Sequence, residues 1–457
     1  MEGLSYFKER LEHEDPIIRR QTIEELMEME LDAQVEHLVA RRLEDCDRGV
    51  RDAAAQFVLN HPSEAVLEYL ASLMGSDEIV VRNLAGDLLV KIGAPSVPYI
   101  APYVHHDNHD VRKFAIDLLA LMPEAAAHLA TEVAQHFHDP DANVVCAAID
   151  AIGAFRAEEY ADALVDLYHQ YEYARPNVVS AIARFPHRVD VQFFREALED
   201  EDPVVQLTAA EALARLHDVN WLALLIEQAS KVNELARPIV LKAIAELVKE
   251  TGDYSIIPAE LHPYYMEMAM DMDENFVQAA VEVLIHFPDE EVIDVLISRI
   301  GVNDNLDVMI YQKLAQSHLN VLERLIQIAE EKHLTPNIVA QFILGLLSNY
   351  AQTDEGFVNQ PVAEQAVTYL KNHFYDFTSE VKTAVLDMCR AFQLPHFCGL
   401  IENAVRDMDP IIQDYAIDVL KEISNEQVRQ ELTRVLEEEG INSELVQHLK
   451  TVQGKVC

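Results

Sequence analysis

Glycine, tryptophan, cysteine and positive charge are all scarce in this sequence of 457 residues. There are 13 glycines and a single tryptophan, Trp221. Low glycine together with frequent Ala, Leu, Val and Glu favours helices over strands. Hydrophobic residues make up 50% of the chain, which is ample for a continuous core and argues against disorder.

The five cysteines are scattered, and none forms a C-x-x-C pair. That excludes the common zinc and redox motifs, and a low, odd count is typical of a reducing compartment. The sequence also has no run of about 18 apolar residues and no apolar signal region near its start. We therefore expect a cytoplasmic protein without membrane insertion.

Basic residues are outnumbered by acidic ones, 35 against 79, for a formal net charge of -44. A surface that binds nucleic-acid phosphates needs an excess of Lys and Arg, so this class of partner is excluded. Anionic membrane surfaces are disfavoured for the same reason. Two interpretations stay open: the chain binds a basic protein partner, or its charge keeps a long apolar-rich molecule soluble.

Self-similarity is the strongest feature of the sequence. In a clear copy, Val81-Arg82 is followed by Ala85 and Leu89, and most copies are 30 to 36 residues apart. One step is shorter, at 27 residues, and one is longer, at 43. Spacing more than local motif supports the copies at Val178, Val240, Val308 and Ile338. The aligned positions are Ile18, Val50, Val81, Val111, Val144, Val178, Val205, Val240, Phe276, Val308, Ile338, Val381 and Ile412.

Each part of the repeat has a physical reason. An Asp such as Asp15 caps a helix N-terminus, and a following Pro suits the first turn because its missing N–H costs nothing there. The Val, the Ala four residues later and the Leu eight residues later share one helical stripe that must be buried. A second apolar helix, such as residues 64–74, fills the rest of each period. The pattern predicts an all-α, α-α superhelical solenoid of about 13 helical-hairpin repeats.

The stretch from Val81-Arg82 through Ile92-Gly93 and Pro98 to Val111-Arg112 resembles the HEAT-repeat superfamily. Its nearest likeness there is the short phycobilisome-lyase-type HEAT-like repeat. The resemblance covers nearly the whole chain, and it implies that the Val-Arg helices line a concave surface. It implies no single activity, because such scaffolds carry many unrelated roles.

We expect one continuous array over residues 1–457, with residues 1–14 and 424–457 as terminal capping helices. Residues 348–365 lengthen one repeat, either as a neutral surface loop or as a partner contact. Residues 251–275 are also irregular and contain Met266, Met268, Met270 and Met272. These methionines either fill the core of a distorted repeat or form an adaptable contact surface.

An acidic residue stands six positions after the aligned Val in nine of the thirteen copies. This position lies off the buried stripe, so the carboxylates should form a ladder near solvent on one face of successive helices. The ladder is either a groove for a basic or amphipathic segment or an ordinary solubilising position of HEAT-like repeats. We name it the acidic column: Glu24, Asp87, Asp117, Asp150, Glu211, Glu246, Glu282, Asp387 and Asp418.

Two neighbouring turns are rich in histidine and aspartate. The histidines are His105, His106, His109, His136 and His138. Imidazole and carboxylate groups in adjacent turns are metal ligands in other proteins, whereas solvated turn and capping roles need no ligand. These histidines are the metal candidates of the sequence, and no cofactor is expected.

The sequence contains no convincing catalytic constellation. It has no P-loop, no G-x-S-x-G elbow and no H-E-x-x-H motif. HEAT-like metal-dependent hydroxylases use several His-Glu pairs as iron ligands, and here only His13-Glu14 matches that dipeptide. HEAT-like bilin lyases share the repeat without diagnostic residues, and HEAT-like DNA glycosylases need a basic groove. We therefore expect a non-catalytic scaffold that binds a protein with a basic or amphipathic segment, with a metal-dependent hydroxylase or bilin-lyase-type enzyme as the alternative.

Overall fold

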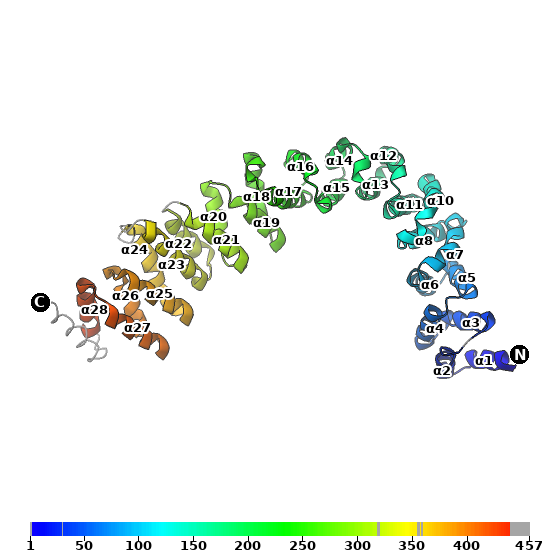
Figure 1. Ribbon diagram of the computed structural model, residues 1–457, viewed down its shortest axis with the longest axis horizontal. Helices are drawn as coiled ribbons and strands as arrows, with labels where there is room; N and C mark the ends of the chain where they lie inside the picture. Colours follow the sequence, from blue (N-terminus) through cyan, green and yellow to red (C-terminus); the bar gives the residue numbers. More distant parts are fainter. Residues whose placement is uncertain (1, 30, 318–319, 354–356, 358–359, 439–457) are drawn as a thin grey trace. The chain divides into compact units, whose positions relative to one another are not determined.

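The computed structural model describes residues 2–29, 31–317, 320–353, 357 and 360–438, which form helices and turns without any β-strand. The chain divides into two compact units, residues 1–240 and 241–457, and the boundary falls inside α17 (Arg237–Thr251). Each unit is a stack of helical pairs (Figure 1). That the two units continue a single array stays a prediction.

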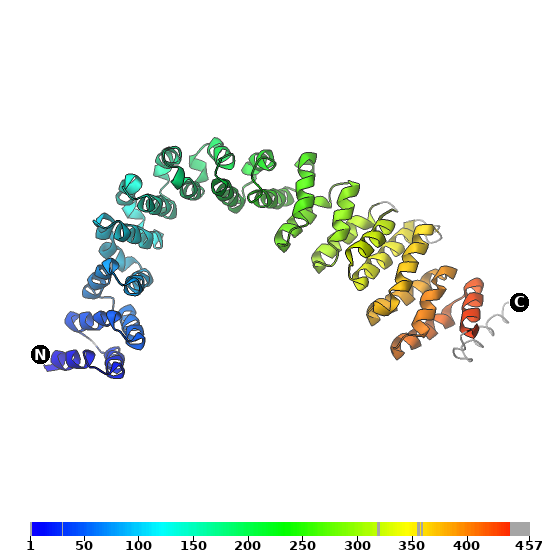
Figure 2. The same cartoon turned by 180° about the vertical axis from the view of Figure 1, so that it is seen from behind.

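The first helix of every pair contains an aligned position, and within each unit these helices form a layer that we name the first-helix layer. In unit 1 this layer lies on the concave side of the stack (Figures 1 and 2). Its members in unit 1 are α2 (Pro16–Leu26), α4 (Arg48–Asn60), α6 (Ile79–Ile92), α8 (His109–Ala120), α11 (Ala142–Phe155), α13 (Arg175–Ile182) and α15 (Pro203–Leu216).

The second helices are shorter, and several continue into 3-10 turns such as η4 (Ala101–His105) and η6 (Gln135–His138). They form the second-helix layer. In unit 1 it consists of α1 (Glu2–Leu11), α3 (Ala33–Ala40), α5 (Glu64–Ser72), α7 (Val97–Ile100), α9 (Pro123–Ala126), α10 (Ala130–Ala134), α12 (Ala161–Gln170), α14 (Val191–Leu198) and α16 (Leu222–Gln228).

Unit 2 has the same two layers. After α17, its first-helix layer consists of α19 (Glu274–Leu284), α21 (Asp304–Ala315), α23 (Pro336–Thr353), α25 (Ser379–Phe392) and α27 (Pro410–Glu422). Its second-helix layer consists of α18 (His262–Met268), α20 (Glu290–Ser298), α22 (Asn320–Lys332), α24 (Pro361–Asn372), α26 (Cys398–Val405) and α28 (Glu426–Glu438).

The predicted helix signals are confirmed. Asp15 caps α2 by accepting a hydrogen bond from the N–H of Ile17 at 2.9 Å, and Pro16 follows in the first turn. The buried stripe of α4 contains Val50 and Ala54, both with no exposed surface. Because the stripe of each first helix is covered by its neighbours in the stack, the pairs share one core in each unit.

Nine of the thirteen aligned residues are buried, Ile18, Phe276 and Ile338 are half-buried, and the predicted register is wrong at Val308. Val308 is exposed, and the buried stripe of α21 contains Leu306, Ile310 and Leu314 instead. These three residues have the spacing of a Val, Ala and Leu stripe that begins two residues earlier. Spacing alone placed Val308, since the local motif is absent there, and a shift of two residues turns a helix face by roughly 200°.

The two irregular segments, residues 251–275 and 348–365, have different structures. Met268 lies in the core, as does Tyr265, whereas Met270 and Met272 are exposed. Core filling is therefore confirmed for Met268, and a contact surface at Met270 and Met272 stays a prediction. Residues 348–353 are helical and lengthen α23, where the Tyr350 hydroxyl donates to the carbonyl of Leu314 at 3.0 Å. This corrects the expectation of a surface loop for those residues. Residues 354–356 and 358–359 of the insertion lie outside the described part of the chain.

Two first helices of unit 1 approach each other closely at Gly153 of α11. A Cβ atom there would lie 2.7 Å from the Cα atom of Ala181 in α13. Backbone atoms cannot move aside as a flexible side chain can, so only glycine allows this spacing of α11 and α13.

We predict that Gly153→Ala lowers the free energy of local unfolding of α11 and α13 by about 1–3 kcal/mol, because the added methyl group pushes the two backbones apart. Amide hydrogen exchange read by mass spectrometry measures this helix by helix. Gly75→Ala is the matched control, since a Cβ atom at Gly75 meets nothing within 4 Å. Equal protection of α11 and α13 in both variants would contradict the packing described.

The buried stripe allows a second prediction. Ala54→Asp places a carboxylate among fully buried side chains of α4, and we expect a loss of about 3–5 kcal/mol in local stability. Ala142→Asp is the control, because Ala142 is exposed in the first turn of α11, where negative charge is tolerated. Hydrogen exchange in α4 and α11 provides the comparison, and unchanged exchange in α4 would show that its register is wrong.

Candidate functional site

The turns that precede the first helices share one geometry. In residues 45–47, the Asp45 carboxylate accepts a hydrogen bond from the N–H of Asp47 at 3.0 Å, and Asp47 caps α4 by accepting from Val50 at 3.1 Å. The residue between the two acceptors, Cys46, is exposed. The same bonds recur in residues 139–141, 200–202, 271–273 and 407–409.

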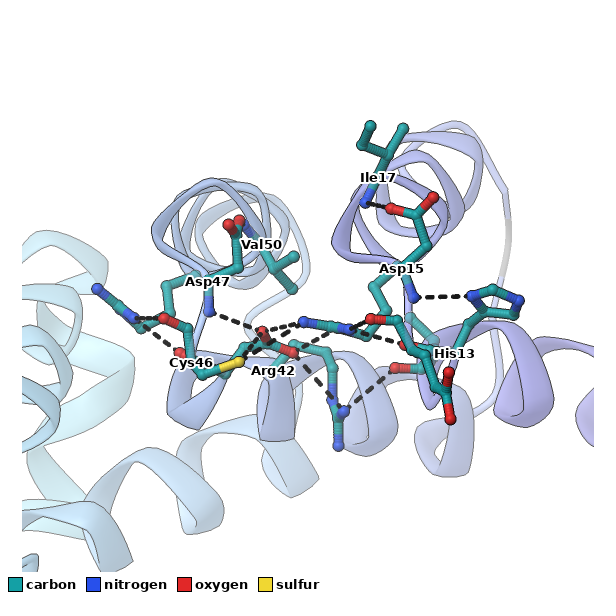
Figure 3. Close-up of polar contacts among 12 residues, drawn as sticks. His13, Asp15, Ile17, Arg42, Cys46, Asp47 and Val50 are labelled. Atoms are coloured by element: carbon teal, nitrogen blue, oxygen red, sulfur yellow. Dashed lines mark hydrogen bonds and ion pairs between the residues drawn. The ribbon is translucent and has the colours of Figure 1, made fainter.

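A buried ion pair joins the first such turn to the helix before it. Arg19, one residue after the aligned Ile18, donates from Nε and Nη2 to the two carboxylate oxygens of Asp45 at 2.8 and 2.6 Å. Its Nη1 atom donates to the carbonyl oxygens of His13 and Glu14 (Figure 3). One guanidinium therefore holds two successive turns together. We name this arrangement the turn clamp.

Turn clamps recur where a carboxylate or amide is available in the next turn. Arg112 repeats the arrangement with Asp139 at 2.7 and 2.9 Å, and Lys382 reaches Asp407 at 2.7 Å. Gln206 serves as a neutral version, since its Oε1 atom accepts from the backbone and side chain of Asn233, both at 2.8 Å. Bidentate pairing suits the planar guanidinium, and burial makes each clamp sensitive to loss of one partner.

The clamp changes the acidity of its carboxylate. Burial by itself raises the pKa of Asp139, but hydrogen bonds from Arg112, from the N–H of Asp141 and from His136 outweigh it and lower this pKa to about 2. Asp45 is shifted in the same direction by Arg19 and the N–H of Asp47, again against the effect of burial on its pKa. Both carboxylates are therefore ionised at neutral pH.

The acidic column lies on the first-helix layer, as predicted, with every member half-buried or exposed. Seven of its nine carboxylates lie within 4.0 Å of a Lys or Arg nitrogen. Asp87 has no such partner in the described chain, and Asp150 accepts from the amide of Asn177 at 2.9 Å. The column is therefore largely neutralised by cations on the same layer, and exposed pairs of this kind contribute little stability.

Two column members on adjacent helices affect each other. Asp150 retains exposed surface, yet desolvation by the surrounding protein raises the pKa of its carboxyl. The carboxylate of Asp117 raises it further, against the hydrogen bond from Asn177.

The histidine-rich turns are neighbours, as predicted, since Arg112 bonds carbonyls of one turn and the Asp139 carboxylate of the other. The rings of His105 and His136 are 5.3 Å apart, and His136 contacts Asp139 at 3.1 Å. His109 lies 3.4 Å from Asp141.

The other two candidate metal ligands, His106 and His138, contact a backbone N–H of the turn and a tyrosine hydroxyl. The Nδ1 atom of His106 accepts from the N–H of Asn108 at 3.1 Å, and His138 lies 3.2 Å from the hydroxyl of Tyr171. Within the described residues, no group of three or more His, Cys, Asp or Glu side chains is arranged to hold a metal ion. The metal hypothesis therefore gains no support from this geometry.

The single His-Glu dipeptide also belongs to a turn. The Nδ1 atom of His13 accepts a hydrogen bond from the N–H of Asp15 at 3.0 Å, so His13 takes the place that Asp45 has in the next turn. Its carbonyl oxygen accepts from Arg19 at 2.7 Å. These contacts give His13 a structural role.

The turn clamp was missed in the sequence, although a signal for it exists. Asp-x-Asp recurs in front of several first helices, and the first Asp stands 25 to 27 residues after a cation that follows an aligned position. After Arg51 and Arg82 the clamp is absent, and the first residue of the next turn there is Ser76 or His106. Arg82 makes no side-chain hydrogen bond or ion pair with the described residues.

The chain can be compared with known proteins by sequence and by structure. No family model matches this chain, and no curated protein matches it by sequence. Solved structures similar to it include a chain from the complex of Kap95p with RanGDP, at 14% identity and a TM-score of 0.47, covering 98% of this chain and 66% of that one. Kap121p is similar at 13% identity and a TM-score of 0.41, covering 96% and 50%.

A third similar structure is the complex of CpcE and CpcF of phycocyanin lyase from Nostoc sp. PCC7120, at 16% identity and a TM-score of 0.29. It covers 56% of this chain and 94% of that one. The chain spans between half and two thirds of the length of the Kap121p and Kap95p chains. The class of protein rests on the helices themselves: within the described residues, each unit is an all-helical stack of helical pairs.

The length and apolar character of a helix decide whether it could span a membrane. Within the described residues, no single helix is long and apolar enough to cross a membrane. The segments His109–Ala120 and Pro123–His138 reach that length and composition only together, and they meet at a bend of 107°.

We predict that Arg112→Gln lowers the local stability of α8 and α11 by about 3–5 kcal/mol at neutral pH, because the Asp139 carboxylate loses its buried partner. Arg48→Gln is the control, since the Arg48–Asp52 pair is exposed and should contribute less than about 1 kcal/mol. Hydrogen exchange of α4, α8 and α11 measures both.

The pH dependence of this effect has a definite sign. The folded pKa of Asp139, about 2, lies below the unfolded value of about 3.9, so its contribution is complete above the unfolded pKa. It is lost as the pH falls toward the folded pKa. The difference between wild type and Arg112→Gln should therefore shrink as the pH falls from about 5 toward 3. A difference that is constant over this range would contradict the clamp.

Proposed function

We propose that this chain is a non-catalytic scaffold that binds a protein partner with a basic segment along the first-helix layer. The observation that carries the proposal is the acidic column on the concave side of unit 1. Asp87, Asp117 and Asp150 stand at equivalent positions of three successive first helices, α6, α8 and α11. Only Asp117 among them has a cation within 4.0 Å in the described chain.

These three carboxylates are the least neutralised part of the column. Repulsion between Asp117 and Asp150 already raises the pKa of Asp150, in addition to desolvation. A cation placed between them would relieve that repulsion. Charges on a binding surface mainly raise the association rate and select partners of opposite charge, and they contribute less to affinity.

A metal-dependent or bilin-lyase-type enzyme on the same scaffold is the alternative from the sequence. The histidine-rich turns have partners within the fold, and the His13-Glu14 dipeptide belongs to a turn. No observation in the described chain favours the enzyme over a binding role. Metal analysis of the purified protein provides a direct check, and stoichiometric iron or zinc would favour the enzyme.

Binding of a fluorescent oligolysine peptide, followed by anisotropy at low and high salt, tests the proposal. The variant Asp87→Asn/Asp117→Asn/Asp150→Asn should bind several-fold more weakly and show a flatter salt dependence, since salt screens these charges. The matched control is Glu64→Gln/Glu68→Gln/Glu124→Gln, which removes the same charge from exposed residues of the second-helix layer.

An equal loss of binding in the two triple variants would mean that net charge alone attracts the peptide, and the proposed surface would be wrong. Absence of binding to the wild-type chain at low salt would contradict the proposed function itself.

A further inference from the structure

The turns before the first helices form one edge of each unit, which we name the turn edge. The turn clamps demonstrate that successive turns are neighbours: Arg19 joins the turns at residues 13–15 and 45–47, and Arg112 joins those at 106–108 and 139–141. In unit 2, Lys382 bonds to the turn at 407–409. First helices that pack side by side in the same direction place all their N-termini on this edge.

The clamp geometry leaves particular positions of each turn outside the core. The two flanking acceptors face the backbone, so the residue between them points to solvent, as do the first residues of the following helix. In Figure 3 the side chain of Ile17 points away from the clamp. An apolar side chain is not required at these positions, since other copies have Gly49, Asn143 and Asn275 there.

Large apolar side chains nevertheless occupy these outward positions in several turns of both units. Asp-Pro is followed by Ile or Val three times, at Ile17, Val204 and Ile411, and a methionine stands between two Asp residues twice. The exposed fractions are Ile17 55%, Ile79 62%, Val80 64% and Val204 54% in unit 1, and Met272 99%, Met408 96% and Ile411 74% in unit 2. Packing of the described fold does not account for them, because they contact mainly solvent.

The same turns carry carboxylates without cations. Four of these acids in unit 1 are exposed and make no side-chain hydrogen bond or ion pair with the described residues: Glu14, Asp77, Glu78 and Glu201. Glu78 stands at the N-cap of α6 without capping it, directly before Ile79 and Val80. The free negative charge and the exposed apolar groups therefore occur together.

Cations gather at the other end of the first helices. Several of these helices have Lys or Arg in the last turn, where positive charge is favoured by the helix dipole: Lys91, Arg215, Lys249, Lys313, Arg390 and Lys421. Four of these six pair with column acids. In unit 1 the turn edge therefore has free carboxylates, whereas the opposite border of the first-helix layer has cations such as Lys91 and Arg215.

We propose that the turn edge is the docking surface for a cationic amphipathic segment of a partner protein, whose apolar residues cover the exposed Ile, Val and Met side chains. The proposal rests on the proposed function and moves the principal contact from the acidic column to this edge. Charge complementarity selects the cationic side of the segment, and burial of the apolar groups supplies affinity that salt does not screen.

Two peptides of equal net charge test the proposal on the full chain: a leucine–lysine amphipathic peptide and an oligolysine. The edge variants are Ile79→Ser/Val80→Ser in unit 1 and Met408→Ser/Ile411→Ser in unit 2. The control is Leu121→Ser, because Leu121 is 66% exposed at the C-terminal end of α8, on the other side of the layer. All of these positions are exposed, so the variants should fold as the wild type does.

We expect at least one edge variant to weaken binding of the amphipathic peptide by about ten-fold, equivalent to burial of one or two aliphatic groups. Oligolysine binding should change by less than about two-fold, since these variants alter no charge. The Leu121→Ser variant should bind both peptides as the wild type does.

Other outcomes separate the two proposals. Unchanged binding of the amphipathic peptide by both edge variants, or an equal loss in Leu121→Ser, would overturn the turn-edge proposal. If oligolysine binding then still depends on Asp87, Asp117 and Asp150, the proposed function stands without it. Failure of both peptides to bind the wild-type chain would overturn the proposed function and the turn-edge proposal together.

Discussion

No helical pair in this chain can bury its own apolar face, and the rest of the structure depends on that constraint. The stripe of α4 that contains Val50 and Ala54 is fully buried only because the neighbouring helices cover it. Stacking therefore has to continue from pair to pair within each unit. It also leaves little space at some helix contacts, such as the one where Gly153 of α11 meets Ala181 of α13.

Parallel stacking of the first helices also determines where charged residues gather. It brings their N-terminal turns into one edge, where Asp residues cap helices and accept the guanidinium or ammonium group of the preceding copy. The C-terminal ends collect Lys and Arg. A chain with a net charge of -44 thus has an uneven surface, on which the acidic column is largely paired and the turns retain free carboxylates.

Much of the fold could be predicted because its signals are local. Caps such as Asp15 with Pro16, and stripes such as Val81, Ala85 and Leu89, act within one helix and can be recognised without neighbours. Prediction failed where the local signal was weak: Val308 was aligned by spacing alone and is exposed. The candidate surface was predicted in position, since the column acids lie on the first-helix layer. Its pairing was not predicted, although six of its seven pairs join residues three or four apart in one helix, and only Lys249 and Glu282 belong to different helices.

The sequence by itself determined the helical pairs, their period, most of their buried stripes and the sign of the net charge, because these properties depend on residues within one or two helical turns of each other. Only the tertiary structure decided which charges pair between successive repeats and which apolar residues stay in solvent. Arg19 meets Asp45 and Arg112 meets Asp139 across 26 and 27 residues, and Ile79 is exposed although its neighbour Val81 is buried. Those outcomes depend on how consecutive pairs stack, and no single repeat contains that information.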